Sequence, residues 1–221
     1  PDQRNHGQSD HDDIIDYPSL TSDMEEFFAD QKIEKAILVG HSMGGKVAMN
    51  FALKNPEKVT KLVIVDIAPR AYATTGEYAL QAHFHRKIIK ILLSLDIQNA
   101  NSRSEVDSTL ASFINDSQVR QFLLKNLKRN NDGSFYWGLN LKSLDANIQK
   151  LLDAVDSTAR IFSHPTLLIS GNKSGYIKSE DLIDFNNIFT DFNHTELDCG
   201  HWVHVEQPEM FMTVLLKFRS E

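Results

Sequence analysis

Residues Ala36-Ile37-Leu38-Val39-Gly40-His41-Ser42-Met43-Gly44-Gly45 decide how this chain folds. The four apolar residues at 36–39 form a continuous run of the kind found in buried parallel strands. A second run, with apolar residues at helical spacing, occupies 46–53 and ends before Pro56. The sequence therefore predicts a strand, a sharp turn at Ser42 and a helix.

The turn has the Gly-x-Ser-x-Gly pattern of a nucleophile elbow, which exposes one serine hydroxyl for covalent catalysis. We expect a strained backbone at Ser42, and we expect a side chain at Gly40 or Gly44 to collide with the neighbouring strand or helix. The first turn of the helix favours a developing anion, so the backbone N–H of Met43 is the expected oxyanion donor. The alternative is an ordinary glycine-rich turn with a solvent-exposed serine.

Composition excludes several classes of protein. At 221 residues with 41% hydrophobic content, the chain can bury the core of one elaborated domain or of two small ones. A net charge of −7 without a stripe of basic residues argues against nucleic acid as the main partner. The single cysteine, Cys199, excludes an intramolecular disulfide and fits a reducing compartment, so we expect a cytoplasmic protein. No apolar stretch is long enough to span a membrane.

Strand and helix patterns alternate along much of the chain. Four segments have the pattern of strands: 36–39, 62–65, 166–169 and the more polar 194–199. Helical patterns occur at about 19–31, 43–54, 179–189 and 207–219. This alternation predicts an α/β fold with a mostly parallel sheet and helices on both faces, and the polar strand is expected nearer the sheet edge.

Residues 70–160 break the alternation. Helical patterns occur near 77–95, 104–112, 116–129 and 141–155, with a turn at 131–133 and no convincing central strand. We expect this insertion to form a helical cap over the carboxyl edge of the sheet, and residues 1–69 and 161–221 to form the core. Six aromatic residues could line an acyl pocket or pack the cap's own core: Tyr78, Phe84, Phe122, Phe135, Tyr136 and Trp137.

A serine nucleophile needs a histidine that accepts its proton. His201 follows Gly200 directly beyond the last predicted strand, so it is the expected base. His204, three residues further on, is the alternative. His83 and His85 lie two residues apart on a predicted helix and face different directions, which makes them a poor metal pair.

The histidine in turn needs a carboxylate that fixes its tautomer. Asp66 directly follows the strand 62–65, and a charged residue at the end of such an apolar strand calls for a partner. The loop at 170–178, after the next core strand, contains no carboxylate. Asp66 is therefore the expected acid, and the alternative is an aspartate that only caps the entry to the insertion. The order Ser42, Asp66, His201 is the one expected for this arrangement.

Five motifs span the chain: DQRNHGQS at 2–9, GHSMGGK at 40–46, DIAP at 66–69, QFLLK at 121–125 and GHWVHVE at 200–206. Together they resemble the bacterial YbfF-type esterases and the related eukaryotic ABHD11-like group of the α/β-hydrolase superfamily. The resemblance implies an α/β-hydrolase fold, hydrolysis of carboxylic esters or acyl-CoA thioesters, and no metal or organic cofactor. It also supports Asp66 as the acid.

One part of the family pattern is missing. Members carry several strands and a His-Gly loop ahead of the segment that corresponds to residues 4–7, and that loop supplies the second oxyanion N–H. We expect this chain to lack these N-terminal strands, at least one β-α-β unit of roughly 30 residues. Only the Met43 half of the oxyanion hole is then found in this sequence, and residues 4–7 have a structural role.

The sequence thus predicts a serine carboxylester hydrolase, an esterase or acyl-CoA thioesterase, that forms an acyl-enzyme with a small-molecule ester or thioester. Two alternatives stay open. One is a cofactor-free haloperoxidase or carbon–carbon bond hydrolase with the same three residues, and the other is a catalytically silent domain that binds a ligand or a protein. Four basic residues could meet a CoA phosphate, although solvated helix faces also explain them: Arg70, Lys125, Lys128 and Arg129.

Overall fold

The computed structural model describes residues 1–72, 79–158 and 160–221. The chain divides into two compact units. Residues 17–72 and 151–221 form the first, which we call the sheet unit. Residues 1–16 and 73–150 form the second, which we call the inserted unit.

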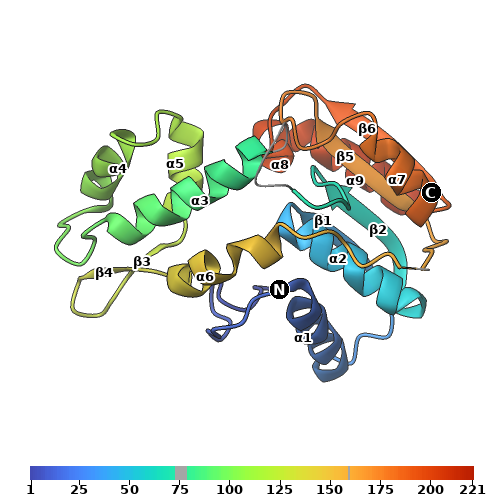
Figure 1. The fold of residues 1–221 in the computed structure, drawn as a ribbon, viewed down its shortest axis with the longest axis horizontal. Coiled ribbons are helices and arrows are strands. Elements are labelled where there is room, and N and C mark those ends of the chain that lie inside the picture. Colours follow the sequence, from blue (N-terminus) through green and yellow to red (C-terminus); the bar gives the residue numbers. More distant parts are fainter. Residues whose placement is uncertain (73–78, 159) are drawn as a thin grey trace. The chain divides into compact units, whose positions relative to one another are not determined.

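The sheet unit contains a four-stranded parallel sheet in the order β1-β2-β5-β6 (Figure 1). Its strands are β1 (Ala36–His41), β2 (Val59–Val65), β5 (Thr166–Gly171) and β6 (Phe192–Leu197). The predicted α/β fold with a parallel sheet is confirmed, and the polar strand does lie at the edge. That strand begins and ends two residues earlier than expected, so Cys199 lies in the loop that follows it.

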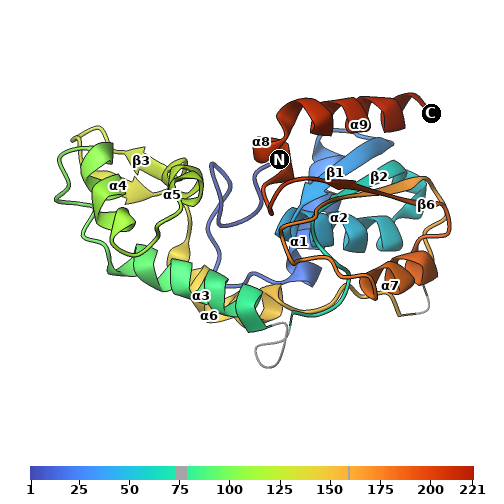
Figure 2. The ribbon, with the colours of Figure 1, turned by 90° about the horizontal axis from the view of Figure 1, so that it is seen from above.

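Helices cover both faces of this sheet (Figure 2). One face is covered by α1 (Tyr17–Asp30), α2 (Met43–Lys54) and α7 (Asp181–Ile188). The other is covered by α9 (Pro208–Ser220), which follows the short helix α8 (Val203–Glu206). Alternating strand residues supply the two cores, since successive side chains of a strand point to opposite faces. The α9 side packs one buried cluster: Val63, Val65, Leu167, Ile169, Leu197, Cys199, Val203, Phe211 and Phe218.

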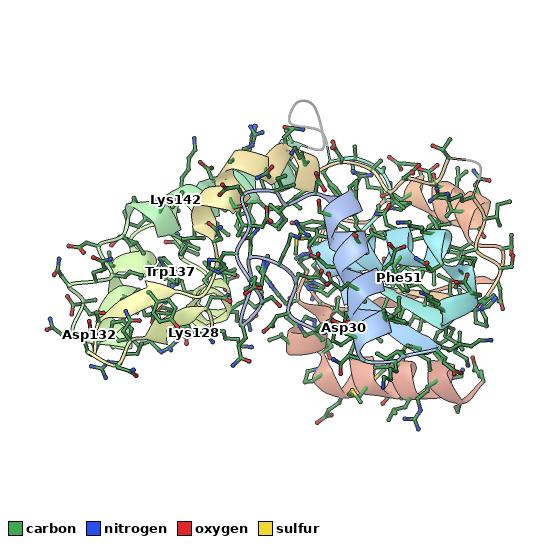
Figure 3. All side chains as sticks on the ribbon, turned by 90° about the horizontal axis from the view of Figure 1, so that it is seen from below. Asp30, Phe51, Lys128, Asp132, Trp137 and Lys142 are labelled. Carbon is green, nitrogen blue, oxygen red and sulfur yellow. The ribbon has the colours of Figure 1, made fainter. Side chains whose placement is uncertain are left out.

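On the opposite face, Phe51 of α2 packs its ring against Phe28 of α1 at 4.7 Å between centroids (Figure 3). Phe185 of α7 stacks on Phe192 of β6 at 5.0 Å. The first contact joins α2 to α1, and the second joins α7 to β6. Helix α2 itself packs against β1 and β2, and it begins immediately after Ser42.

The inserted unit is mainly helical, as expected, with α3 (Ala79–Ser94), α4 (Arg103–Ala111), α5 (Ser117–Leu124) and α6 (Leu141–Leu151). The prediction of one helix over 116–129 is wrong, because α5 ends at Leu124. Two short antiparallel strands follow, β3 (Leu127–Arg129) and β4 (Phe135–Trp137), and Lys128, Asp132 and Trp137 mark this hairpin in Figure 3. This hairpin is separate from the four-stranded sheet, and the sequence pattern did not predict it.

The first sixteen residues pack differently from the expectation that placed 1–69 in the core. They group with the insertion, and Asn5 supplies the reason. Asn5 is fully buried, and its amide donates a hydrogen bond to Ser143 Oγ at 3.3 Å. Its carbonyl oxygen accepts from Asn140 at 3.0 Å and from the Asp12 N–H at 2.8 Å. These bonds tie the start of the chain to α6 and to the loop before it.

Over the part of the chain that the structure describes, no helix has both the length and the apolar character needed to cross a bilayer.

Candidate active site

The turn between β1 and α2 has the strained geometry expected of an elbow. Ser42 has φ 53° and ψ −122°, in the positive-φ region that residues other than glycine seldom adopt. Its backbone N–H donates to the carbonyl of Val65 at 3.0 Å, which anchors the turn to the neighbouring strand. The helix begins at the next residue, Met43, so the N–H of Met43 belongs to the first turn and has no carbonyl of a preceding helical turn to bind.

Close packing at this turn depends on Gly40 and Gly45. A Cβ at Gly40 would overlap the carbonyl of Gly44, and a Cβ at Gly45 would lie 2.6 Å from the side chain of Ile67. A Cβ at Gly44 would meet nothing within 4 Å. The expected collision at Gly44 is therefore wrong, because that position faces open space and Gly45 is the crowded one.

The structure brings Ser42, His201 and Asp66 together, from three separate parts of the sheet unit. His201 Nε2 lies 3.1 Å from Ser42 Oγ, and His201 Nδ1 lies 2.8 Å from Asp66 Oδ2. His204, the alternative base, lies in α8, where its ring faces those of His41 and Phe211 at 4.9 Å and 6.1 Å between centroids. The hydrogen-bonded chain from hydroxyl to imidazole to carboxylate thus runs through His201.

Asp66 is fully buried at the end of β2, with φ 51°. Its other carboxylate oxygen, Oδ1, accepts hydrogen bonds from the Gly171 N–H and the Ser174 hydroxyl, each at 2.9 Å. Burial raises the pKa of Asp66 to about 6, while these two donors act in the opposite direction. The carboxylate is therefore mostly ionised at neutral pH, and it presents Oδ2 to His201.

The environment of His201 keeps the imidazole neutral. Burial lowers the pKa of His201 below its ordinary value, so the ring can accept a proton near pH 7. Tyr176 stacks on the ring at 3.8 Å between centroids and an interplanar angle of 15°. His41 donates from Nε2 to the backbone carbonyl of His201 at 2.8 Å, and burial lowers the pKa of His41 to about 3.

Sequence reasoning did not find Ser174, Tyr176 or His41 as members of this site. The first two lie in the loop at 170–178, which has no carboxylate that could serve as the acid. That loop follows a strand of the same parallel sheet, so it emerges at the same edge as Asp66. A search for hydrogen-bond donors and aromatic rings there would have found both residues.

The residues considered as ligand contacts lie in several places. Arg70 forms an ion pair with the buried carboxylate of Asp181, with 2.6 Å between Nε and Oδ1. Lys125, Lys128 and Arg129 belong to the inserted unit and are exposed. Of the aromatic residues there, Phe135 is buried, Trp137 is partly buried, and Phe84, Phe122 and Tyr136 are exposed. Tyr78 lies outside the described residues.

Among the residues that the structure describes, no group of three or more His, Cys, Asp and Glu side chains is arranged to hold a metal ion.

Comparison with known proteins gives consistent results. The family described as alpha/beta hydrolase fold matches residues 1–208. The sn-1-specific diacylglycerol lipase ABHD11 of Danio rerio is 34% identical over 221 residues, which cover 98% of this chain and 67% of that protein. Esterase YbfF of Escherichia coli is 29% identical, with 100% of this chain and 81% of that protein covered. The solved structure of a marine microorganism esterase has a TM-score of 0.92 and 38% identity, covering 98% of this chain and 82% of that one.

Proposed function

The chain belongs to the α/β-hydrolase family, and from that premise we propose that it is a serine carboxylester hydrolase that works through an acyl-enzyme. One observation carries the proposal. Ser42 Oγ, the His201 ring and the Asp66 carboxylate form a continuous hydrogen-bonded chain at a strained strand–helix turn. Related proteins named as esterases and as a diacylglycerol lipase support the same type of reaction.

In the first half of the reaction, Ser42 Oγ attacks the ester carbonyl carbon while His201 Nε2 accepts the serine proton. Asp66 holds the proton of Nδ1 and stabilises the imidazolium that forms. The negative charge on the carbonyl oxygen is stabilised by the N–H of Met43 in the first turn of α2. The intermediate then breaks its bond to the leaving oxygen, and His201 gives that oxygen the proton.

In the second half, a water molecule attacks the acyl-enzyme carbonyl and His201 accepts a proton from the water. The bond from the acyl group to Ser42 Oγ breaks, and His201 returns a proton to Oγ. The carboxylic acid leaves, and both side chains regain their starting protonation states. A thioester follows the same steps with sulfur as the leaving atom, so acyl-CoA is a second substrate class for the same machinery.

Labelling with a fluorophosphonate probe tests the nucleophile. We expect the wild-type chain to be labelled and Ser42→Ala to lose labelling, because the probe reacts with an activated serine. Ser170→Ala is the matched control. Ser170 also contacts a histidine, with 2.7 Å between Oγ and His194 Nε2, but it is 1% exposed within β5.

The control should therefore be labelled like the wild type. Absence of labelling in the wild type contradicts the enzyme proposal and favours a silent binding domain. A substrate panel then compares short p-nitrophenyl esters with acyl-CoA thioesters. Turnover of neither class, in a chain that is labelled at Ser42, favours the haloperoxidase or carbon–carbon hydrolase alternative.

A further inference from the structure

The loop after β5, residues 172–178, brings two side chains to the proposed active site although it contributes no acid. Ser174 binds Asp66, as described above, and Tyr176 covers one face of the His201 ring. Tyr176 is 7% exposed and the His201 side chain is 11% exposed, so the stacked pair is largely closed to water. None of the steps proposed above uses this tyrosine.

A single hydrogen bond does not fix an imidazole ring. Asp66 holds Nδ1 at 2.8 Å, but the ring can still rotate about that contact and move Nε2 away from Ser42. A parallel aromatic ring at 3.8 Å supplies the missing constraint, because rotation of the imidazole would bring it into the tyrosine face. The same π face also attracts the imidazolium that forms during the reaction.

Tyr176 is itself held in place by contacts of its backbone and of its ring. Its backbone carbonyl accepts from the Tyr72 hydroxyl at 3.0 Å and from the Arg70 guanidinium at 3.4 Å. Its backbone N–H donates to Ser174 Oγ at 3.2 Å. The ring of Tyr72 lies 5.6 Å away between centroids. The tyrosine is therefore a rigid support and not a mobile cover.

We propose that Tyr176 is a positioning residue for His201, whose stacked ring keeps Nε2 in line with Ser42 Oγ through both halves of the reaction. The inference rests on the proposed function, because Tyr176 can have this role only if His201 is the base. It predicts an effect on turnover that is separate from any effect on folding or on substrate binding.

The test compares Tyr176→Leu, which keeps an apolar side chain but removes the ring, with Tyr176→Phe, which keeps the ring. Tyr176→Leu should lower kcat for a p-nitrophenyl ester by about 3- to 10-fold, the size expected for one aromatic pair, with KM changed by less than about 2-fold. Tyr176→Phe should restore most of that loss. Thermal unfolding gives the folded fraction of each variant, and kcat is expressed per folded molecule. Tyr176→Met replaces Tyr176→Leu if the leucine variant does not fold.

Phe185→Leu is the matched control. Phe185 is also buried and also stacks on an aromatic ring, that of Phe192, but it lies in α7 and touches none of the proposed active-site residues in the contacts described above. It should lower Tm without lowering kcat per folded molecule. A kcat of Tyr176→Leu within about 2-fold of the wild type overturns the inference, and so does a phenylalanine variant as slow as the leucine variant. A wild type without turnover or labelling instead overturns the proposed function.

Discussion

Both oxygens of the buried Asp66 carboxylate have hydrogen-bond partners, and the partners of the two oxygens have different roles. Oδ2 faces His201, while Oδ1 accepts from Gly171 N–H and Ser174 Oγ. A buried carboxylate without donors would remain protonated at neutral pH, since burial penalises its charged form. The two donors on Oδ1 therefore help to keep Asp66 ionised, which its proposed role beside His201 requires.

Removal of the Ser174 donor should shift the pH dependence of activity. Activity should fall in acid as Asp66 becomes protonated, since burial raises the pKa of Asp66 to about 6. In Ser174→Ala the carboxylate loses a donor that favours its charged form, so its pKa rises and activity falls at a higher pH than in the wild type. We expect a displacement of about 1 pH unit, the size of one hydrogen bond to a charged group.

The measurement is kcat/KM for a p-nitrophenyl ester between about pH 4.5 and about pH 8. Ser179→Ala is the control, because Ser179 lies a few residues further on and is exposed. An acid limb that stays in place in Ser174→Ala, or moves to lower pH, contradicts the role given to Ser174.

At the scale of elements, α2 carries a fully buried lysine one turn after Ser42. Lys46 Nζ donates to the backbone carbonyls of Arg70 and Asp153, and lies 5.6 Å and 5.0 Å from the ring centroids of Tyr17 and Tyr72. Residues 70 and 153 belong to the two segments by which the chain leaves and re-enters the sheet unit. One side chain of α2 thus joins both segments.

Burial also makes Lys46 a source of pH-dependent stability. Burial lowers the pKa of Lys46 in the folded protein from 10.5 to about 7. Between these values the unfolded chain holds a proton at this lysine that the folded chain has lost, so stability rises with pH. We expect the free energy of unfolding of the wild type, relative to Lys46→Met, to rise between about pH 7 and about pH 10 by up to about 1.4 kcal/mol per pH unit.

Urea unfolding at several pH values measures this difference. Lys54→Met is the matched control, because Lys54 lies on the same helix, is half exposed and pairs with Glu25. Its difference from the wild type should vary little over the same range. A flat difference for Lys46→Met, or one that falls with pH, contradicts the lowered pKa of Lys46 in the folded protein.

The sequence was most informative where elements are long and apolar. The runs at 36–39, 62–65 and 166–169 correspond to strands β1, β2 and β5, because a strand buried on both faces needs apolar residues throughout. It was least informative for β3 and β4, which have three residues each. Strands of that length have too few positions to show a periodic pattern. These two strands form because they pair with each other across the turn at 131–133.

The same division holds for the site. Ser42, Asp66 and His201 could be proposed from the sequence because each follows a predicted strand in the expected order, and a triad has fixed chemical requirements. The contacts of Tyr176 and Ser174 could not, since they depend on where a loop without regular structure folds back. Residues 1–16 could not be placed either, because their attachment relies on polar side-chain bonds and not on an apolar pattern.

At the scale of the whole molecule, the two units can be followed separately because the chain has two tryptophans. Trp137 lies in the inserted unit, where its Nε1 donates to the carbonyl of Leu92 at 3.2 Å. Trp202 lies in the sheet unit, beside His201. Fluorescence of Trp202→Phe therefore reports the inserted unit, and fluorescence of Trp137→Phe reports the sheet unit.

Asn5→Ala tests whether the start of the chain belongs to the inserted unit. Asn5 has φ 67° and is fully buried, so alanine loses its hydrogen bonds and is strained in that backbone conformation. We expect a loss of about 2 to 3 kcal/mol in the stability of the inserted unit, seen as a lower urea midpoint of Trp137 fluorescence. The Trp202 midpoint should change less, because the side-chain hydrogen bonds of Asn5 lie within the inserted unit.

Asn99→Ala, at an exposed asparagine of the same unit, is the control and should leave both midpoints in place. An equal shift of both midpoints, or a shift confined to Trp202, would place residues 1–16 with the sheet unit.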